Sequence, residues 1–184
     1  LVIDNRDSFV FNLVDEFASR GRDVTTVRGN ITPDRLRDIV SQLEPRLVVL
    51  SPGPGRPEHA GAMVPWLRER PDIPVLGVCL GMQMLFERSL EFGEHKGLGL
   101  LPGEVVPIPQ ETPERNPIRN SNVGWSALMT PDGSDRFADP LLAGQEGGAS
   151  YVYFVHSFHA RTAHAAECSA TINYHGHAVS AAVH

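Results

Sequence analysis

Short apolar runs alternate with amphipathic stretches through the first half of the chain, and this alternation constrains the fold more than any other feature. The run 47–50 is apolar at every position, which is typical of a parallel strand covered on both faces. The stretch that follows Thr32 begins with Pro33 and repeats apolar residues at helical spacing, so it predicts a capped helix. The expected strands are 1–3, 24–27, 47–50 and 75–78, and the expected helices are 9–21, 33–43 and 60–69.

Repeated strand and helix units with short links predict a mainly parallel sheet wound with right-handed crossovers, in a three-layer α/β fold. From about Leu98 the pattern changes to short strand-like pieces separated by Gly, Pro and Asn, which predicts a β-rich, mostly antiparallel flank. These pieces are 104–108, 151–155, 169–174 and 178–183, and the polar stretches 111–122 and 132–149 are the expected mobile loops. No domain boundary is visible, so residues 1–184 are expected to form a single domain.

The composition argues against several classes of protein. Of the 184 residues, 41% are hydrophobic and 21% charged, and no apolar run approaches the roughly 18 residues that cross a bilayer. No membrane partner is therefore expected. A formal net charge of -6, without a cluster of Lys and Arg, argues against nucleic acid as a partner. The two cysteines, Cys79 and Cys168, have neither disulfide-dense nor zinc-type spacing, so both are expected to be reduced thiols of a cytoplasmic protein.

The strongest local motif is Gly77-Val78-Cys79-Leu80-Gly81, which lies between an expected strand and a helical pattern over 82–86. In a G-x-C-x-G turn the glycines permit a bend tight enough to hold the cysteine above the end of the sheet. The helix that follows presents its amino end to the sulfur, which is expected to favour the thiolate. The alternative is a small buried cysteine beside structural glycines. Cys168 has no such motif and is expected to be structural.

A second motif, SPGPGRP at residues 51–57, follows the strand 47–50 directly. Ligands of a doubly wound sheet bind beyond the carboxyl ends of its strands, so this loop and Cys79 are expected to face one crevice. A backbone N–H of the loop, together with that of Leu80, could hold the oxyanion formed when a thiolate attacks a carboxamide. The alternative is a rigid turn built of proline and glycine.

These motifs resemble those of the class I glutamine amidotransferases. The likeness to the glutaminase component of anthranilate or aminodeoxychorismate synthase covers about residues 1–81 and lies in 1–9, 12–14, 51–55 and 77–81. The likeness to the glutaminase subunit of imidazole glycerol phosphate synthase covers about residues 81–184 and lies in 81–83, 85–89, 97–99, 122–125 and 153–157. The resemblance implies a flavodoxin-like fold and the hydrolysis of glutamine to glutamate and ammonia.

The resemblance also implies roles for single residues. Cys79 would be the nucleophile, and Gln83 would contact the substrate from one helical turn further along. Leu80 and the loop Gly53-Pro54-Gly55 would form the oxyanion site, and the backbone groups of glutamine would be held by His156, Ser157 and Phe158. The alternative for Gln83 is a solvent-facing helix residue. Without the resemblance, His156 is expected to be a histidine satisfied in the core. No metal and no cofactor is expected.

The family completes its triad with a histidine and a glutamate in a segment of the Phe-His-Pro-Glu type, after the strand expected at 178–183. This chain ends at His184 and begins equally abruptly at Leu1, so it is expected to be truncated at both ends. General acid–base help is worth about 10²- to 10⁴-fold, which makes binding or slow thioester formation the expectation for the chain as given. His156, His159, His175 and His177 are not expected to replace the missing base.

The partner implied by the resemblance is a synthase subunit that receives the ammonia. The likeness over 81–184 favours the cyclase of imidazole glycerol phosphate synthase, in histidine biosynthesis, whereas residues 1–81 favour a chorismate-using synthase such as that of tryptophan biosynthesis. Two alternatives from other classes are a cysteine hydrolase of another amide and an inactive binding module that lacks the His-Glu pair.

Overall fold

The computed structural model describes residues 1–53, 61–69, 71–134, 136–137, 142 and 148–184. The chain forms two compact units, Leu1–Leu85 and Phe86–His184. The expected single domain over residues 1–184 stays a prediction. In the part of the chain that is described, no helix is long and apolar enough to cross a membrane.

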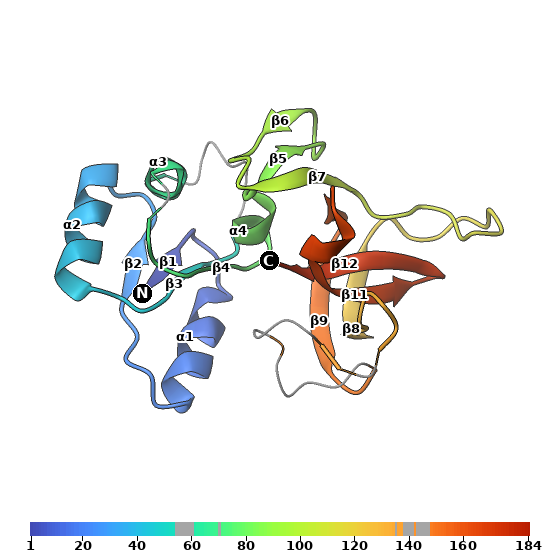
Figure 1. Cartoon of the computed structure of the whole chain (residues 1–184), viewed down its shortest axis with the longest axis horizontal. Coiled ribbons are helices and arrows are strands. Elements are labelled where there is room, and N and C mark those ends of the chain that lie inside the picture. The colour runs from blue at the N-terminus through green and yellow to red at the C-terminus, as the bar shows by residue number, and fades with distance from the viewer. Residues whose placement is uncertain (54–60, 70, 135, 138–141, 143–147) are drawn as a thin grey trace. The chain divides into compact units, whose positions relative to one another are not determined.

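The amino-terminal unit is built on a four-stranded sheet in the order β2-β1-β3-β4 (Figure 1). Every neighbouring pair in this sheet runs parallel, as predicted. The order reverses between β1 and β3, and this switch point is where ligands of open α/β sheets bind. The strands are β1 Val2–Asp4, β2 Thr26–Arg28, β3 Val48–Leu50 and β4 Val75–Gly77.

Helices cover both faces of this sheet, which gives the expected three layers. Figure 1 shows α1 on one face and α2 and α3 on the other. The start of α2 agrees with the prediction, because Thr32 accepts a hydrogen bond from the Arg35 N–H and Pro33 occupies the first helical position. The three helices are α1 Val10–Ser19, α2 Pro33–Leu43 and α3 Met63–Arg68.

Alternate residues of the parallel strands face the two helical layers. Val2 and Val49 form a buried cluster with Val10 of α1, against which Leu13, Val14 and Phe17 pack. The neighbouring residues Ile3, Val48 and Leu50 are also fully buried, so both faces of the sheet are covered. The continuous apolar run at 47–50 is explained by this double burial.

The regular elements described in the carboxyl-terminal unit are strands, apart from one 3-10 turn, so this unit is β-rich, as predicted. One sheet has the order β10-β7-β5-β6, with β5 and β7 parallel and the other pairs antiparallel. Two antiparallel ribbons, β8-β9 and β11-β12, accompany it. The strands are β5 Phe86–Ser89, β6 His95–Lys96, β7 Leu101–Pro107, β8 Asn122–Ala127, β9 Tyr151–His156, β10 Phe158–Thr162, β11 Cys168–Tyr174 and β12 His177–Val183, and a 3-10 turn spans Ala165–Glu167.

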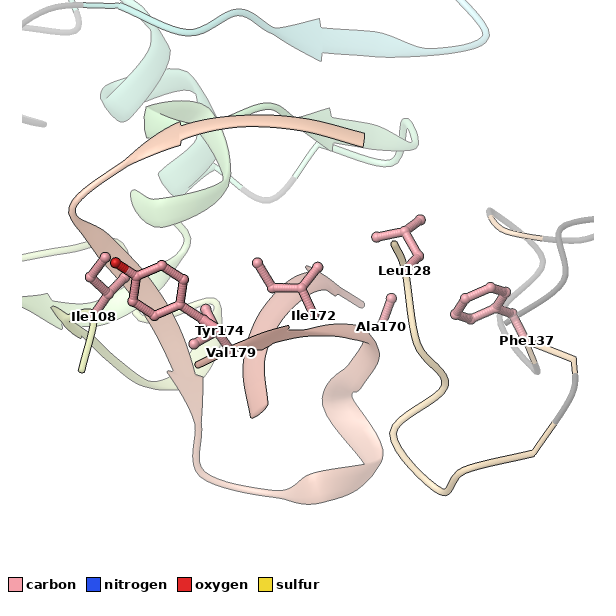
Figure 2. Close-up of a cluster of buried hydrophobic side chains, with 7 residues drawn as sticks. All are labelled: Ile108, Leu128, Phe137, Ala170, Ile172, Tyr174 and Val179. Carbon is pink, nitrogen blue, oxygen red and sulfur yellow. The ribbon is translucent and has the colours of Figure 1, made fainter. Parts of the chain in front are cut away.

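The core of this unit is shown in Figure 2. Ala170, Ile172 and Tyr174 project from one face of β11 and pack with Val179 of β12. The same cluster contains Ile108, Leu128 and Phe137, which come from the ends of strands and from a loop. A pair of hydrogen bonds between the backbones of Met129 and Thr171 joins the end of β8 to β11.

The strands β5, β6, β8 and β10 were not predicted, and the helix expected after Cys79 differs most from its prediction. The helix predicted from the pattern over 82–86 was wrong, because α4 spans only Leu80–Gln83 and Phe86 begins β5. Phe86 is fully buried and pairs with Leu101 in the sheet of the carboxyl-terminal unit, so tertiary packing overrides the local helical spacing. Residues 135, 138–141 and 143–147 of the loop expected at 132–149 lie outside the described residues.

Candidate active site

Cys79 lies at a sharp turn between the end of β4 and the start of α4. Its backbone has φ 50° and ψ −116°, a left-handed conformation that is unfavourable for a residue with a side chain. A strained strand-to-helix turn of this kind projects the side chain of its central residue above the sheet, as in the nucleophile elbow of hydrolases. In agreement with that geometry, Cys79 is solvent-exposed.

Two glycines allow the turn to close. A Cβ atom at Gly77 would lie 2.6 Å from the carbonyl carbon and oxygen of Gly81 and from the Met82 nitrogen. A Cβ atom at Gly81 would lie 2.6 Å from the carbonyl oxygen of Leu50 in β3. Both glycines are therefore required by close approach of backbone to backbone, which agrees with the reason for expecting them in the motif.

The environment of the Cys79 thiol raises its pKa. Burial is the larger cause, because the protein around the sulfur displaces water even though the residue as a whole is exposed, and the Asp7 carboxylate adds to the effect. The prediction that α4 lowers the pKa of Cys79 and so favours the thiolate was therefore wrong, because the pKa is raised. With four residues, α4 is too short for a substantial dipole, whereas Asp7 supplies a full negative charge.

Asp7→Asn is expected to lower the pKa of Cys79, because it removes the charge that disfavours the thiolate. The variant keeps the oxygen that accepts the hydrogen bond from the Phe9 N–H at 2.7 Å, so the start of α1 should be preserved. The measurement is the pH profile of Cys79 alkylation by iodoacetamide. The profile should move to lower pH with its alkaline plateau unchanged. Asp15→Asn, at an exposed position of α1, is the matched control, and equal profiles for the two variants would contradict the prediction.

The loop after β3 is fixed to the turn after β1. Ser51 is fully buried, and its hydroxyl accepts a hydrogen bond from the Asn5 N–H at 2.9 Å and donates one to the Pro52 carbonyl at 2.8 Å. Gly53 lies directly against Asn5. The remaining members of the expected oxyanion loop, Pro54 and Gly55, lie outside the described residues. The turn after β1, the loop after β3 and the turn at Cys79 are thus all at the carboxyl edge of one sheet.

The first residues of α4 carry two of the predicted contacts. Leu80 is buried, and no described residue accepts a hydrogen bond from its N–H. A group of this kind, one residue beyond the nucleophile, is the usual oxyanion donor of a nucleophile elbow. Gln83 is half-buried and donates its N–H to the Cys79 carbonyl at 3.0 Å. The same short helix therefore holds both residues beside Cys79.

His156, Ser157 and Phe158 lie at the junction of β9 and β10 in the carboxyl-terminal unit. The His156 Nδ1 lies 2.9 Å from the Phe158 carbonyl oxygen and donates to it, so Nε2 accepts from the Asn122 side-chain amide at 3.1 Å. Burial lowers the pKa of His156, and the bond to Phe158 partly opposes this shift. The imidazole is thus neutral with both nitrogens engaged, which suits it to holding the backbone at Ser157 and not to acting as a base.

Several residues of the site were not predicted from the sequence. Asp7, Asn5 and Ser51 belong to motifs that were noted, but nothing in their spacing indicated a role for their side chains. The position of Asp7 in the turn that follows an expected parallel strand was the available signal, because ligands gather at that edge. Asn122 was noted only as part of the resemblance, and its bond to His156 depends on antiparallel pairing of β8 with β9.

Comparison with known proteins shows the family to which the chain belongs. The model of the glutamine amidotransferase class-I family matches residues 1–184, and the chain therefore belongs to that family. Among curated proteins, it is 49% identical over 87 residues to the imidazole glycerol phosphate synthase subunit HisH of Wolinella succinogenes, covering 47% of this chain and 39% of the relative. It is 38% identical over 110 residues to the imidazole glycerol phosphate synthase subunit HisH 1 of Legionella pneumophila strain Lens. These residues cover 60% of this chain and 51% of the relative.

A relative from the other branch is similarly close. Anthranilate synthase component 2 of Vibrio parahaemolyticus is 43% identical over 86 residues, which cover 46% of this chain and 44% of the relative. The chain spans about half the length, or less, of the curated relatives that it matches. Both branches of the resemblance are thus represented among the relatives.

Proposed function

We propose that this chain carries the nucleophile and oxyanion site of a glutaminase that supplies ammonia to a synthase. The observation that carries the proposal is the strained, exposed Cys79 at the end of β4, one residue before an amide N–H without a described acceptor. Such an arrangement suits attack on a carbonyl and stabilisation of the resulting oxyanion.

The proposed reaction has two covalent steps. The Cys79 thiolate forms a C–S bond with the side-chain carboxamide of glutamine, the C–N bond breaks, and the nitrogen takes up a proton and leaves as ammonia. Water then attacks the glutamyl thioester, releases glutamate and restores the thiol. Since the pKa of Cys79 is raised, a proton acceptor must take the thiol proton at neutral pH.

Other residues are assigned to binding. The N–H groups of Leu80 and of the loop Gly53-Pro54-Gly55 are proposed to hold the oxyanion, with Pro54 excepted because proline has no N–H. Gln83 is proposed to contact the substrate from α4. The backbone at His156, Ser157 and Phe158 is proposed to hold the amino and carboxylate groups of glutamine, supported by the exposure of Ser157 and the fixed imidazole beside it.

The proposed partner is the synthase subunit that consumes the ammonia, in a cytoplasmic heterodimer. Imidazole glycerol phosphate synthase, a lyase of histidine biosynthesis, is favoured by the relatives named HisH. Anthranilate or aminodeoxychorismate synthase is the alternative, supported by the relative named anthranilate synthase component 2. A binding module without turnover is a further alternative, and the raised pKa of Cys79 is the observation in its favour.

The test is glutamate release from glutamine by the chain alone, with a purified cyclase subunit, and with a purified chorismate-using subunit. We expect slow release by the chain alone and stimulation by the cyclase subunit. Stimulation only by the chorismate-using subunit would assign the chain to the alternative pathway. The same mixtures with the Cys79→Ala variant are the control. Absence of glutamate in every mixture, together with retained binding to a synthase subunit, would establish the binding module instead.

A further inference from the structure

The Ser51 hydroxyl determines which way the Pro52–Gly53 peptide faces. Ser51 has no exposed surface, and its hydroxyl both accepts from the Asn5 N–H and donates to the Pro52 carbonyl. The bond from Asn5 leaves the hydroxyl hydrogen free to point at the Pro52 oxygen. Leaving a buried carbonyl without its hydrogen-bond donor costs free energy. The hydrogen bond from Ser51 therefore stabilises this orientation of the Pro52 carbonyl.

The orientation of that carbonyl also sets the direction of an N–H group. The Pro52 carbonyl and the Gly53 N–H belong to one planar trans peptide and point to opposite sides of the chain. When the Pro52 oxygen faces the Ser51 hydroxyl, the Gly53 N–H faces away from it. No described residue accepts a hydrogen bond from the Gly53 N–H.

Asn5 prevents the loop from shifting sideways. A Cβ atom at Gly53 would lie 2.2 Å from the Asn5 Nδ2 and 2.4 Å from the Asn5 carbonyl oxygen, so the two residues are in close contact. Asn5 is itself nearly buried. Its neighbour Asp4 is fixed by a hydrogen bond from the Arg6 N–H at 2.8 Å and by an ion pair with Arg28 at 3.3 Å. The turn against which Gly53 packs is therefore held in place by contacts of Asp4.

We propose that Ser51 and Asn5 are positioning residues that aim the Gly53 N–H at the oxyanion. This inference rests on the proposed glutaminase function. Oxyanion donors accelerate a reaction only when they are oriented before the charge develops, because reorientation during the reaction costs part of the stabilisation. Neither side chain needs to touch the substrate for this effect.

The test compares Ser51→Ala with the wild-type chain, each assayed with the synthase subunit that stimulates it. Two rates are measured at the same pH: glutamine hydrolysis, which passes through an oxyanion, and iodoacetamide alkylation of Cys79, which does not. We expect Ser51→Ala to lower kcat for glutamine by roughly 10- to 100-fold, with KM and the alkylation profile within about twofold of wild type. Ser51→Thr, which keeps the hydroxyl, should restore kcat. Ser169→Ala removes a different buried hydroxyl and is the matched control.

Each outcome decides the inference. If the wild-type chain turns over glutamine and Ser51→Ala has the same kcat, the positioning role is overturned and the proposed function stands. A wild-type chain and partner without turnover would overturn both. If Ser51→Ala yields no folded protein, Ser51→Cys replaces it, because a thiol is a weaker donor of similar size. A lowered ratio of hydrolysis to Cys79 alkylation, mapped by peptide mass spectrometry, then supports the inference, and an unchanged ratio overturns it.

Discussion

A chloromethyl ketone analogue of glutamine is expected to add one adduct to this chain, on Cys79, and none to the Cys79→Ala variant. The sulfur displaces chloride in a single step, so labelling requires an accessible nucleophile and does not require completion of a catalytic cycle. Cys79 is exposed at the turn between β4 and α4, and this access favours its reaction. The measurement is the intact mass of the protein, followed by peptide mapping. Loss of labelling in the variant should be complete.

Cys168 is the natural control for this experiment. Its pKa is also raised by burial, so the ionisation of the two thiols does not distinguish them. Accessibility does, because Cys168 is half-buried and its Sγ lies 3.4 Å from the Ala170 carbonyl oxygen. Cys168→Ala should therefore label like wild type. Equal labelling of both cysteines, or protection of neither by excess glutamine, would contradict a glutamine site at Cys79.

Gly77→Ala is expected to destabilise the amino-terminal unit by about 3 kcal/mol, a value at the upper end for overpacking. The new methyl group would meet backbone atoms of Gly81 and Met82 at 2.6 Å, and backbone cannot move aside as a flexible side chain can. The turn must open to relieve the contact, so labelling of Cys79 by the glutamine analogue should fall as well. The measurement is urea unfolding followed by the fluorescence of Trp66, which is buried in α3.

Two further choices make this measurement specific. Trp125→Phe removes the other tryptophan, which lies exposed on β8 in the carboxyl-terminal unit. Gly21→Ala is the matched control, because a Cβ atom there would meet nothing within 4 Å and only its φ of 70° is unfavourable. We expect this control to lose about 1 kcal/mol. If Gly77→Ala unfolds at the same urea concentration as Gly21→Ala, the close backbone contact at Gly77 does not cause the expected extra loss of stability.

Most of the parallel half could be predicted from the sequence because local signals and burial agree there. Thr32 and Pro33 mark the start of α2, and the apolar run at 47–50 marks a doubly covered strand. The length of α4 could not be predicted, since the helical spacing of 82–86 competes with burial of Phe86 in a sheet whose other strands come later in the chain. Such long-range pairing is not visible in a local pattern.

The electrostatics of the site were less predictable than its geometry. The sequence indicated correctly that glycines close the turn around Cys79, because a tight strand-to-helix turn brings backbone close to backbone at both glycine positions. It indicated the wrong direction for the pKa of the thiol, because that value depends on water displaced by neighbouring loops and on Asp7, far away in the sequence. The assigned roles of Gln83, His156, Ser157 and Phe158 derive from the family resemblance and stay predictions.

The backbone of Cys79 shows that folding and chemistry favour different amino acids at position 79. With φ 50° and ψ −116°, glycine would occupy this position at the lowest conformational cost. Glycine, however, has no side chain to present to a substrate. Residue 79 is therefore a place where a more stable protein and a more reactive one require opposite substitutions, and screening variants for thermal stability alone would tend to select against the sulfur.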